Sequence, residues 1–331
     1  MRCQYSTGRL LGEGTYATIK EAFNIETGEA YACKIINKEL VEGREYMVKN
    51  EIGILNRLSN GHPNIVTLHD YFESSNNLYL CFDLCTGGDL FQRISSKGTY
   101  SEAAAAAVVR TIVDALQYIH ASGIVHGDLK PENVLFHTED DDADIRIADF
   151  GLSRLVGEKA RQLTSKTGTP AYMAPETLGE EGHGKPVDIW AVGVITFSML
   201  AGHAPFHRSS RRKEEQAIIA RDVPFEPEEW VNLSSAAREF VEACLVLDPL
   251  GRPTVDELLN HKWLASYGLD SFHPRDDDSA DLTPRVRDAL SKQSVDSYGA
   301  RNEQTSRSNE LEQMRDHENQ TPRPLHKSDP N

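Results

Sequence analysis

The first part of the chain alternates short apolar stretches with polar turns, the pattern of an antiparallel β-sheet. Strands are predicted over Tyr5–Leu11, through Ala22 and Phe23, and over Ala30–Ile36. The spacing then becomes helical from about Lys38 to Leu58, with an apolar stripe at Val48, Ile52, Leu55 and Leu58. Two more strands are predicted, Ile65–Phe72 and a fully buried Leu78–Leu84.

After a glycine break at Cys85–Gly88, the pattern becomes mainly helical. Ser101 opens a long helix that Gly123 ends, with one apolar face formed by Val109, Ile112, Leu116 and Ile119. Another apolar helix starts at Asp188, and His261–Leu264 closes the globular part. Beyond about Ala265 aromatic residues thin out and polar residues dominate, which is the composition of a disordered tail.

Hydrophobic content, net charge and cysteine count limit the kinds of partner that the protein is expected to bind. Of the 331 residues, 39% are hydrophobic, and no apolar run is long enough to predict a membrane span or a secretory signal. A net charge of −16 argues against nucleic acid or an anionic membrane as the main partner. The five cysteines are scattered, and Cys81 and Cys85 have no second pair to complete a zinc site. We therefore expect reduced thiols in a cytoplasmic protein, with the nucleus as the alternative.

The stretch His126–Asn133 carries the most chemistry. It places Asp128, Lys130 and Asn133 in a loop between apolar runs that predict two short buried strands. A second carboxylate, Asp149, follows another strand-like stretch. One carboxylate can face a hydroxyl group, while the other carboxylate and the carboxamide are hard oxygen ligands of the kind that Mg²⁺ prefers beside phosphates.

The glycine-rich segment Gly12–Ala17 lies within a predicted β-hairpin. A Rossmann site needs a helix after its glycines and a Walker loop needs a following Gly-Lys, so neither is predicted. The glycines can bring backbone N–H groups close to phosphates, or they can simply form a tight turn. Lys34 lies mid-strand among apolar residues, where a carboxylate such as Glu51 would satisfy its charge. The simpler alternative is that Lys34 and Glu51 both face water.

These motifs, in this order, resemble those of eukaryotic protein kinases. The resemblance implies an α+β, bilobal protein kinase fold. It assigns residues 1–85 to a small β-rich N-lobe with one main helix, 86–264 to a larger, mainly helical C-lobe, and 265–331 to the polar tail. It also implies that ATP and Mg²⁺ are the cofactors.

By this resemblance, Asp128 orients the substrate hydroxyl and accepts its proton, and Lys130 neutralises the phosphoryl group in transfer. The implied metal ligands are Asn133 and Asp149. Lys34, fixed by Glu51, places the ATP phosphates. The other implied ATP contacts are the glycine loop (Gly12, Glu13, Gly14, Thr15, Tyr16 and Ala17), the adenine sandwich (Leu11, Ile19, Ala32 and Leu135) and the backbone from Asp83 to Cys85, with Phe82 behind the adenine.

The segment Leu152–Glu176 resembles a kinase activation segment, and Thr169 within it is characteristic of serine/threonine kinases. Asp188 is expected to brace the catalytic loop and Arg252 to pair with Glu176. Five stretches look like motifs of calcium/calmodulin-dependent protein kinases, the fungal type I enzymes above all: Gly12–Ala17, Tyr31–Ile36, Gly61–Val66, Thr86–Phe91 and Gly182–Asp188. That resemblance implies signalling to protein substrates with Ser or Thr near basic residues, which Asp89 and Glu132 could attract.

Two departures from the family pattern matter. Gly127 replaces the usual arginine before the catalytic aspartate, which normally meets a phosphate on the activation segment. We therefore expect activity without that phosphorylation, or a different use of it. The tail also lacks a basic helix with apolar anchors; its best candidate, Val286–Lys292, is diluted by acids, so calmodulin control is expected to be weak or absent.

Two alternatives remain open. A pseudokinase scaffold would keep the fold without catalysis, and Ala17 and Gly127 are the departures that favour it. A small-molecule phosphotransferase would share the fold, but the peptide-docking sequence Gly168–Glu176 is against it.

Overall fold

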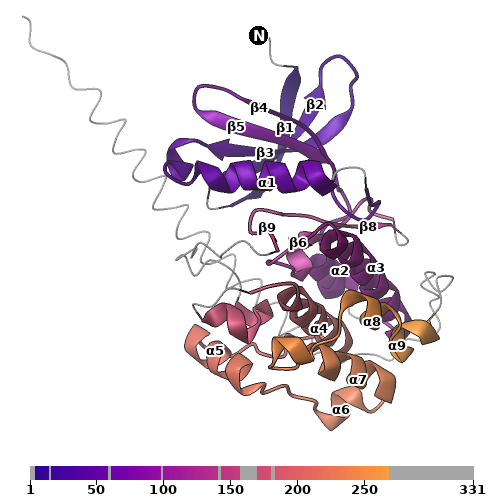
Figure 1. Ribbon diagram of the computed structural model, residues 1–331. Helices are drawn as coiled ribbons and strands as arrows, with labels where there is room; N and C mark the ends of the chain where they lie inside the picture. Colours follow the sequence, from indigo (N-terminus) through magenta and orange to yellow (C-terminus); the bar gives the residue numbers. More distant parts are fainter. Residues whose placement is uncertain are drawn as a thin grey trace, which may run out of the picture. The chain divides into compact units, whose positions relative to one another are not determined.

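A computed structural model describes residues 4–14, 16–58, 61–97, 100–140, 143–156, 170–179 and 183–267. They all belong to one compact unit, Met1–Leu282 (Figure 1). The tail expected from residue 265, including Val286–Lys292, lies outside the described residues beyond Tyr267. Within them, no helix is long and apolar enough to span a lipid bilayer.

The N-terminal part is a five-stranded antiparallel sheet in the order β1-β2-β3-β5-β4. Its strands are β1 (Tyr5–Glu13), β2 (Ala17–Asn24), β3 (Ala30–Asn37), β4 (Leu68–Glu73) and β5 (Asn77–Asp83). The glycine-rich segment joins β1 to β2, as the hairpin prediction required. Register shifts at Leu10 and Gly12 place a bulge beside Leu11, a device that commonly re-aims a side chain near a site.

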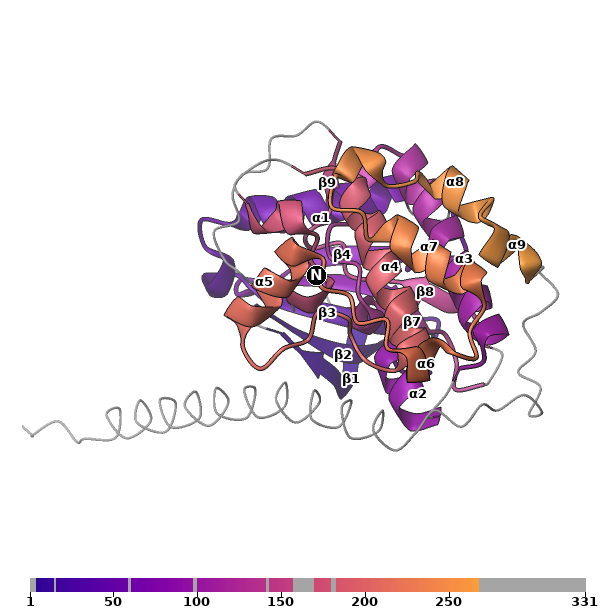
Figure 2. The ribbon, with the colours of Figure 1, turned by 90° about the horizontal axis from the view of Figure 1, so that it is seen from below.

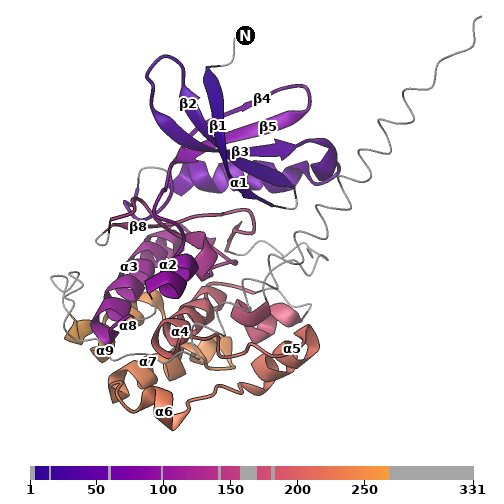
Figure 3. The ribbon, with the colours of Figure 1, turned by 180° about the vertical axis from the view of Figure 1, so that it is seen from behind.

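Helix α1 (Glu45–Leu58) crosses one face of the sheet (Figures 1 and 3). The predicted start at Lys38 is wrong, because a 3₁₀ turn (Glu39–Val41) and Gly43 at φ +73° separate the helix from β3. Left-handed backbone at a glycine cannot continue an α-helix. The buried stripe contains Val48, Leu55 and Leu58 as expected, but also Ile54 and the charged Glu51.

The two later strands also differ from the prediction. β4 begins at Leu68, because Ile65 makes only an isolated bridge to Ile147, in the C-terminal part. β5 is not fully buried; only Leu80 and Cys81 are. A sheet with one face turned to a ligand site does not need an apolar residue at every position.

The C-terminal part is helical and surrounds α4 (Pro186–Ala201), which is buried along almost its whole length between α3 and α7 (Figure 2). The long predicted helix is α3 (Glu102–Ala121), capped by the Ser101 side chain. The remaining helices are α2 (Leu90–Lys97), α5 (Arg211–Ala220), α6 (Pro227–Trp230), α7 (Ser235–Cys244), α8 (Val255–Leu259) and α9 (Lys262–Ser266), with 3₁₀ turns at Pro131–Asn133, Pro170–Tyr172, Pro175–Leu178 and Pro249–Gly251.

Two short strand pairs lie beneath the large sheet: β6 (Ile124–Val125) with β9 (Arg154–Leu155), and β7 (Val134–Phe136) with β8 (Ile145–Ile147). Backbone hydrogen bonds join the two parts, since Val66 N–H donates to the Ile147 carbonyl. A sheet-rich lobe over a helical lobe is the predicted bilobal architecture. The boundaries at 85/86 and 264/265 stay predictions.

Candidate active site

The catalytic-loop candidates lie between β6 and β7 and are joined to one another. Lys130 Nζ lies 2.9 Å from Asp128 Oδ2. Asn133 Nδ2 donates to the Asp128 carbonyl at 2.7 Å and to Asp128 Oδ2 at 3.3 Å. Burial lowers the pKa of Lys130, but the adjacent Asp128 charge outweighs it and the pKa ends above its ordinary value. Lys130 therefore stays cationic beside Asp128.

Asp149 sits just beyond β8, with φ +61°, an unusual conformation for a residue other than glycine. The Ala148 N–H donates to the Asn133 carbonyl at 2.8 Å, so the metal candidates belong to one hydrogen-bonded structure. Burial raises the pKa of Asp149, but the charges of Lys34 and Lys130 hold it below the ordinary value. Strained backbone of this kind persists where surrounding contacts hold it, commonly at functional sites.

The ion pair expected between Lys34 and Glu51 is present. Lys34 Nζ lies 2.6 Å from Glu51 Oε1 and 3.5 Å from Asp149 Oδ1, so one ammonium group links β3, α1 and the loop after β8. Burial lowers the pKa of Lys34, but the charges of Glu51 and Asp149 raise it above its usual value. Glu51 is only 4% exposed, which rejects the alternative of a surface glutamate.

The glycine loop joins β1 to β2, and Gly14 N–H donates to the Ala17 carbonyl. A Cβ built on Gly12 would meet nothing within 4 Å, and one on Gly14 only the Ala17 carbonyl at 3.5 Å. Packing therefore does not require glycine at either position, and the close approach of ATP phosphates to this loop stays a prediction. Glu13 is exposed, Tyr16 accepts a hydrogen bond from Arg44, and Thr15 lies outside the described residues.

The four apolar residues predicted to enclose adenine come from both parts. Leu11 and Ile19 are each 37% exposed, which is high for large side chains inside a sheet. Ile19 pairs with Lys34 and Ala32 with Phe82, and paired residues share a face, so these side chains face the same side as the Lys34 ammonium. Leu135 on β7 is half-buried and bridges to Asp89. Apolar surface left open beside buried charges suits a flat heterocycle.

Asp83 and Cys85 lie in the connection between the two parts. The Asp83 side chain points into a polar cluster: it accepts from the Thr67 N–H at 2.8 Å, contacts His69 Nε2 at 2.7 Å and pairs with Arg146. Burial raises the pKa of the Cys85 thiol to about 11. The backbone contacts of these two residues with adenine stay a prediction.

Asp188, the first acidic residue of α4, braces the catalytic loop as the sequence predicted. It accepts the His126 N–H at 2.9 Å and the Gly127 N–H at 2.8 Å, and His120 Nε2 lies 2.8 Å away. Gly127 has φ +78°, a left-handed conformation that glycine adopts without strain. The unexpected glycine therefore matches the backbone that the brace requires.

Comparison with known proteins places this geometry in a family. The model of the protein kinase domain matches residues 5–264. The chain belongs to the protein kinase domain family. Calcium/calmodulin-dependent protein kinase cmkB of Emericella nidulans is 53% identical over 264 residues, covering 79% of this chain and 65% of that protein. Calcium/calmodulin-dependent protein kinase type I of Schizosaccharomyces pombe is 49% identical, covering 80% and 79%.

These relatives identify the kinase domain as one of the serine/threonine type and confirm its resemblance to fungal type I enzymes. The chain spans just under two thirds of the length of cmkB. Membership of the family implies the use of ATP and typically Mg²⁺. The described ranges hold no cluster of three or more His, Cys, Asp or Glu that could bind a metal alone. Asn133 and Asp149 fit Mg²⁺ instead as a cation that shares its shell with phosphate oxygens.

The kinase domain also contains the predicted buried pair near the peptide-docking loop. Arg252 donates to Glu176 through both terminal nitrogens, at 2.7 and 2.8 Å, and its side chain is fully buried. Asp89 caps α2 by accepting the Gln92 N–H at 2.7 Å. Accepting a backbone N–H does not neutralise the Asp89 carboxylate, so it can still attract a basic group. Most of the activation segment, including Thr164, Ser165, Thr167 and Thr169, lies outside the described residues.

Three functional candidates escaped the sequence analysis: His120, Arg146 and Arg154. His120 supports Asp188, and Arg146 pairs with Asp83, but single residues on a helix or strand carry no local signal for such distant partners. Burial lowers the pKa of Arg154 on β9, whose Nε and Nη2 atoms have no hydrogen-bond partner in the described structure.

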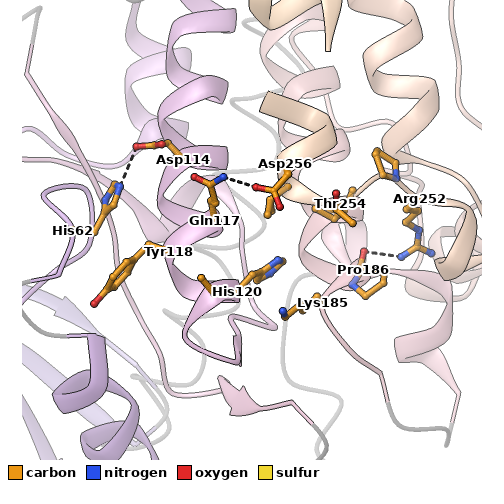
Figure 4. Close-up of a pocket in the computed structure, with 14 residues that line it drawn as sticks. His62, Asp114, Gln117, Tyr118, His120, Lys185, Pro186, Arg252, Thr254 and Asp256 are labelled. Carbon is orange, nitrogen blue, oxygen red and sulfur yellow. Dashed lines mark hydrogen bonds and ion pairs between the residues drawn. The ribbon is translucent and has the colours of Figure 1, made fainter. Parts of the chain in front are cut away.

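A separate pocket of about 630 Å³ is shown in Figure 4. Its walls come from α3, α8 and the start of α4, and it includes none of the predicted ATP contacts. The His120 imidazole lines this pocket and also contacts Asp188, so the pocket adjoins the brace of the loop.

Proposed function

We propose that this kinase domain is catalytically active and transfers the γ-phosphoryl group of Mg-ATP to protein substrates. The target is a Ser or Thr that has basic residues near it in the substrate sequence. The observation that carries the proposal is a set of six polar side chains in two contacting groups, Lys34 with Glu51 and Asp149, and Asp128 with Lys130 and Asn133. A backbone hydrogen bond from the Ala148 N–H to the Asn133 carbonyl joins the two groups. A pseudokinase would usually have lost at least one. All six are present here, so only the departures at Ala17 and Gly127 favour that alternative.

Each residue has a defined part in the transfer. Asp128 Oδ2 is held by Lys130 and Asn133, which leaves Oδ1 to orient the substrate hydroxyl and accept its proton. Lys130 then offsets the charge of the phosphoryl group, and Lys34, held by Glu51, positions the other phosphates. Bound Mg²⁺ would neutralise phosphate charge, with Asn133 and Asp149 as its protein ligands.

A basic substrate is favoured by two acids beside the cleft. Burial raises the pKa of Asp89 and of Glu132. The charge of Asp89 raises the pKa of Glu132 further, because the two carboxylates are close enough to repel each other. Two carboxylates that repel each other gain stability when a guanidinium or ammonium group arrives between them.

The test is phosphate transfer from labelled ATP to an array of Ser/Thr peptides with each basic position replaced by Ala. Wild type should label basic peptides, and Asp128→Asn should not. Glu132→Gln should lose the preference for basic residues while keeping kcat on a neutral peptide within about threefold. Transfer by Asp128→Asn at the wild-type rate would refute the mechanism. Absence of transfer by wild type, with Mg-ATP bound, would favour the pseudokinase.

We further propose that the catalytic loop is ordered without phosphorylation of the activation segment. Gly127 needs no phosphate-bound arginine, and two N–H groups from the loop are already held by Asp188. Phosphatase-treated protein should retain its activity. If treatment abolishes activity and phosphorylation at Thr164 or Ser165 restores it, the proposal is wrong, and Arg154 becomes the cation to test as the partner of the phosphate.

The relatives are named for calmodulin, but we propose that calmodulin control of this chain is weak or absent. The support is the acid-diluted segment Val286–Lys292, which lies outside the described residues. Calorimetric titration of the full chain with calcium–calmodulin should detect no tight complex. Binding with a nanomolar Kd would contradict this.

A further inference from the structure

Two cysteines face each other across the middle of the sheet. Cys33 on β3 is paired with Cys81 on β5, and they are 2% and 0% exposed. They form a buried cluster with Ala22, covered by the aromatic rings of Tyr5, Tyr31, Phe72 and Tyr79. Both side chains are thiols in this structure.

The register shows which kind of pair they form. The Lys38 N–H donates to the Asn76 carbonyl, so these two residues occupy a hydrogen-bonded position of the β3–β5 ladder. The pairing runs without a register shift to Tyr31 and Asp83, and hydrogen-bonded and non-hydrogen-bonded pairs alternate. Cys33 and Cys81 lie five positions along the ladder from Lys38 and Asn76. Because five is an odd number of steps, they are a non-hydrogen-bonded pair.

That position brings the two sulfur atoms within bonding reach. Cα atoms of non-hydrogen-bonded pairs lie about 4.5 Å apart, with their side chains closer than in the other kind of pair. Disulfides span Cα separations of roughly 4.4–6.8 Å. No strand has to slide or turn over for the bond to form. A bond at the short end of this range is expected to be readily reduced.

The pair is also chemically distinct from the other buried thiols. A hydrogen bond from the Cys81 thiol lowers the pKa of Cys33, against the opposing effect of burial. Burial instead raises the pKa of Cys85 and of Cys244. Among the described cysteines, Cys33 is therefore the one whose thiolate is favoured, and thiolate is the form that reacts with peroxides.

We propose that Cys33 and Cys81 form a reversible disulfide when the kinase meets a hydroperoxide, and that this bond lowers kinase activity. The Cys33 thiolate attacks a peroxide oxygen, giving a sulfenic acid and releasing hydroxide. The Cys81 thiol then attacks the sulfenic sulfur and water leaves. In total, two thiols and hydrogen peroxide give one disulfide and two waters; a dithiol reductant reverses the change.

The link to activity is the next residue in the chain. Lys34 follows Cys33 directly and points to the opposite face, where it pairs with Glu51 and Asp149. Opposed Cβ atoms lie about 4.5–5.5 Å apart in a sheet and about 3.8 Å apart across a disulfide. Bond formation therefore draws the strands together by roughly 1 Å at this point, and a displacement of that size at a catalytic group can cost up to about a hundredfold in rate.

The decisive experiment treats the folded full-length chain with hydrogen peroxide, blocks remaining thiols in denaturant, and maps the linkage by tryptic mass spectrometry. Residues 21–34 and 58–93 should appear as one crosslinked species lacking two hydrogens. Because residues 58–93 contain both Cys81 and Cys85, fragment ions must place the link at Cys81. In parallel, kcat/KM for ATP should fall at least about threefold and recover with dithiothreitol.

Cys81→Ala should lose both the crosslink and the reversible inhibition. Cys244→Ala, which removes a buried thiol in α7, should keep both. Absence of the crosslink, or a link to Cys85, would overturn the proposal whatever the activity. A Cys33–Cys81 crosslink without loss of kcat/KM would overturn the regulatory part. Because mass spectrometry needs no catalysis, failure of the disulfide is distinguishable from failure of the proposed function.

Discussion

Replacing Gly127 with alanine tests whether the catalytic loop depends on its left-handed backbone. Gly127 has φ +78°, its N–H is held by Asp188, and a Cβ there would lie 3.2 Å from the Leu152 carbonyl oxygen. The methyl group therefore meets two penalties, one from its own backbone and one from its neighbour. The adjacent residue is Asp128, so any relaxation moves the proposed base.

The magnitude follows from these two terms. Left-handed backbone costs an alanine about 1–2 kcal/mol, of which roughly 0.4–1 kcal/mol is recovered because alanine makes the unfolded chain less flexible. Forcing a methyl group against backbone adds on the order of 1 kcal/mol. The total, about 2 kcal/mol, corresponds to a fall in Tm of roughly 4–8 °C for a domain of this size.

Gly28→Ala is the matched control. Gly28 has φ +74° in the β2–β3 turn, but a Cβ there would meet nothing within 4 Å. It should lose roughly 2–4 °C in Tm, with kcat unchanged. Gly127→Ala should lose more stability and also about tenfold in kcat, since a shift of the loop displaces the base.

Thermal unfolding by circular dichroism and steady-state phosphorylation of one peptide measure both effects. The reasoning fails if Gly127→Ala matches wild type in Tm and kcat, because the loop would then not need glycine. It also fails if Gly28→Ala and Gly127→Ala behave alike in both assays, because the Leu152 contact and the proximity of Asp128 would then have no effect.

Three further predictions follow from the site. Glu51→Gln keeps a hydrogen-bonding oxygen near Lys34 but removes the charge, so kcat/KM for ATP should fall on the order of tenfold or more; unchanged steady-state kinetics would contradict the role of this pair. Asn133→Ala should raise the Mg²⁺ concentration for half-maximal activity at least about tenfold, and an unaltered Mg²⁺ titration would exclude Asn133 as a ligand. Burial lowers the pKa of His183 from 6.5 to about 4, so the unfolded chain takes up a proton first and stability should fall between about pH 6.5 and pH 4, by up to about 2–3 kcal/mol. In His183→Gln, the free energy of unfolding measured with urea should change less with pH over this range. If its pH dependence runs parallel to that of the wild type, the assignment to His183 is refuted.

The bilobal fold was predicted because the motifs, in their order along the sequence, resemble those of protein kinases. Local periodicity predicted only the separate strands and helices. Boundaries were predicted less well. The start of α1 was predicted too early, because Gly43 adopts left-handed backbone and separates the 3₁₀ turn Glu39–Val41 from the helix, which begins at Glu45. β5 was predicted to be fully buried because its composition is apolar, but only Leu80 and Cys81 are buried.

The sequence by itself determined which polar groups the chain offers: an acid and a lysine in one loop, an amide three residues later, and a second acid beyond the next strands. Tertiary structure decided which of them meet. Lys34 contacts Glu51 and Asp149, residues 17 and 115 positions away, and Asp188 braces a loop more than sixty residues earlier. Contacts over such separations depend on how the sheet and α4 pack, and local patterns contain no record of that packing. The same holds for Cys33 and Cys81, which only the register of β3 against β5 places face to face.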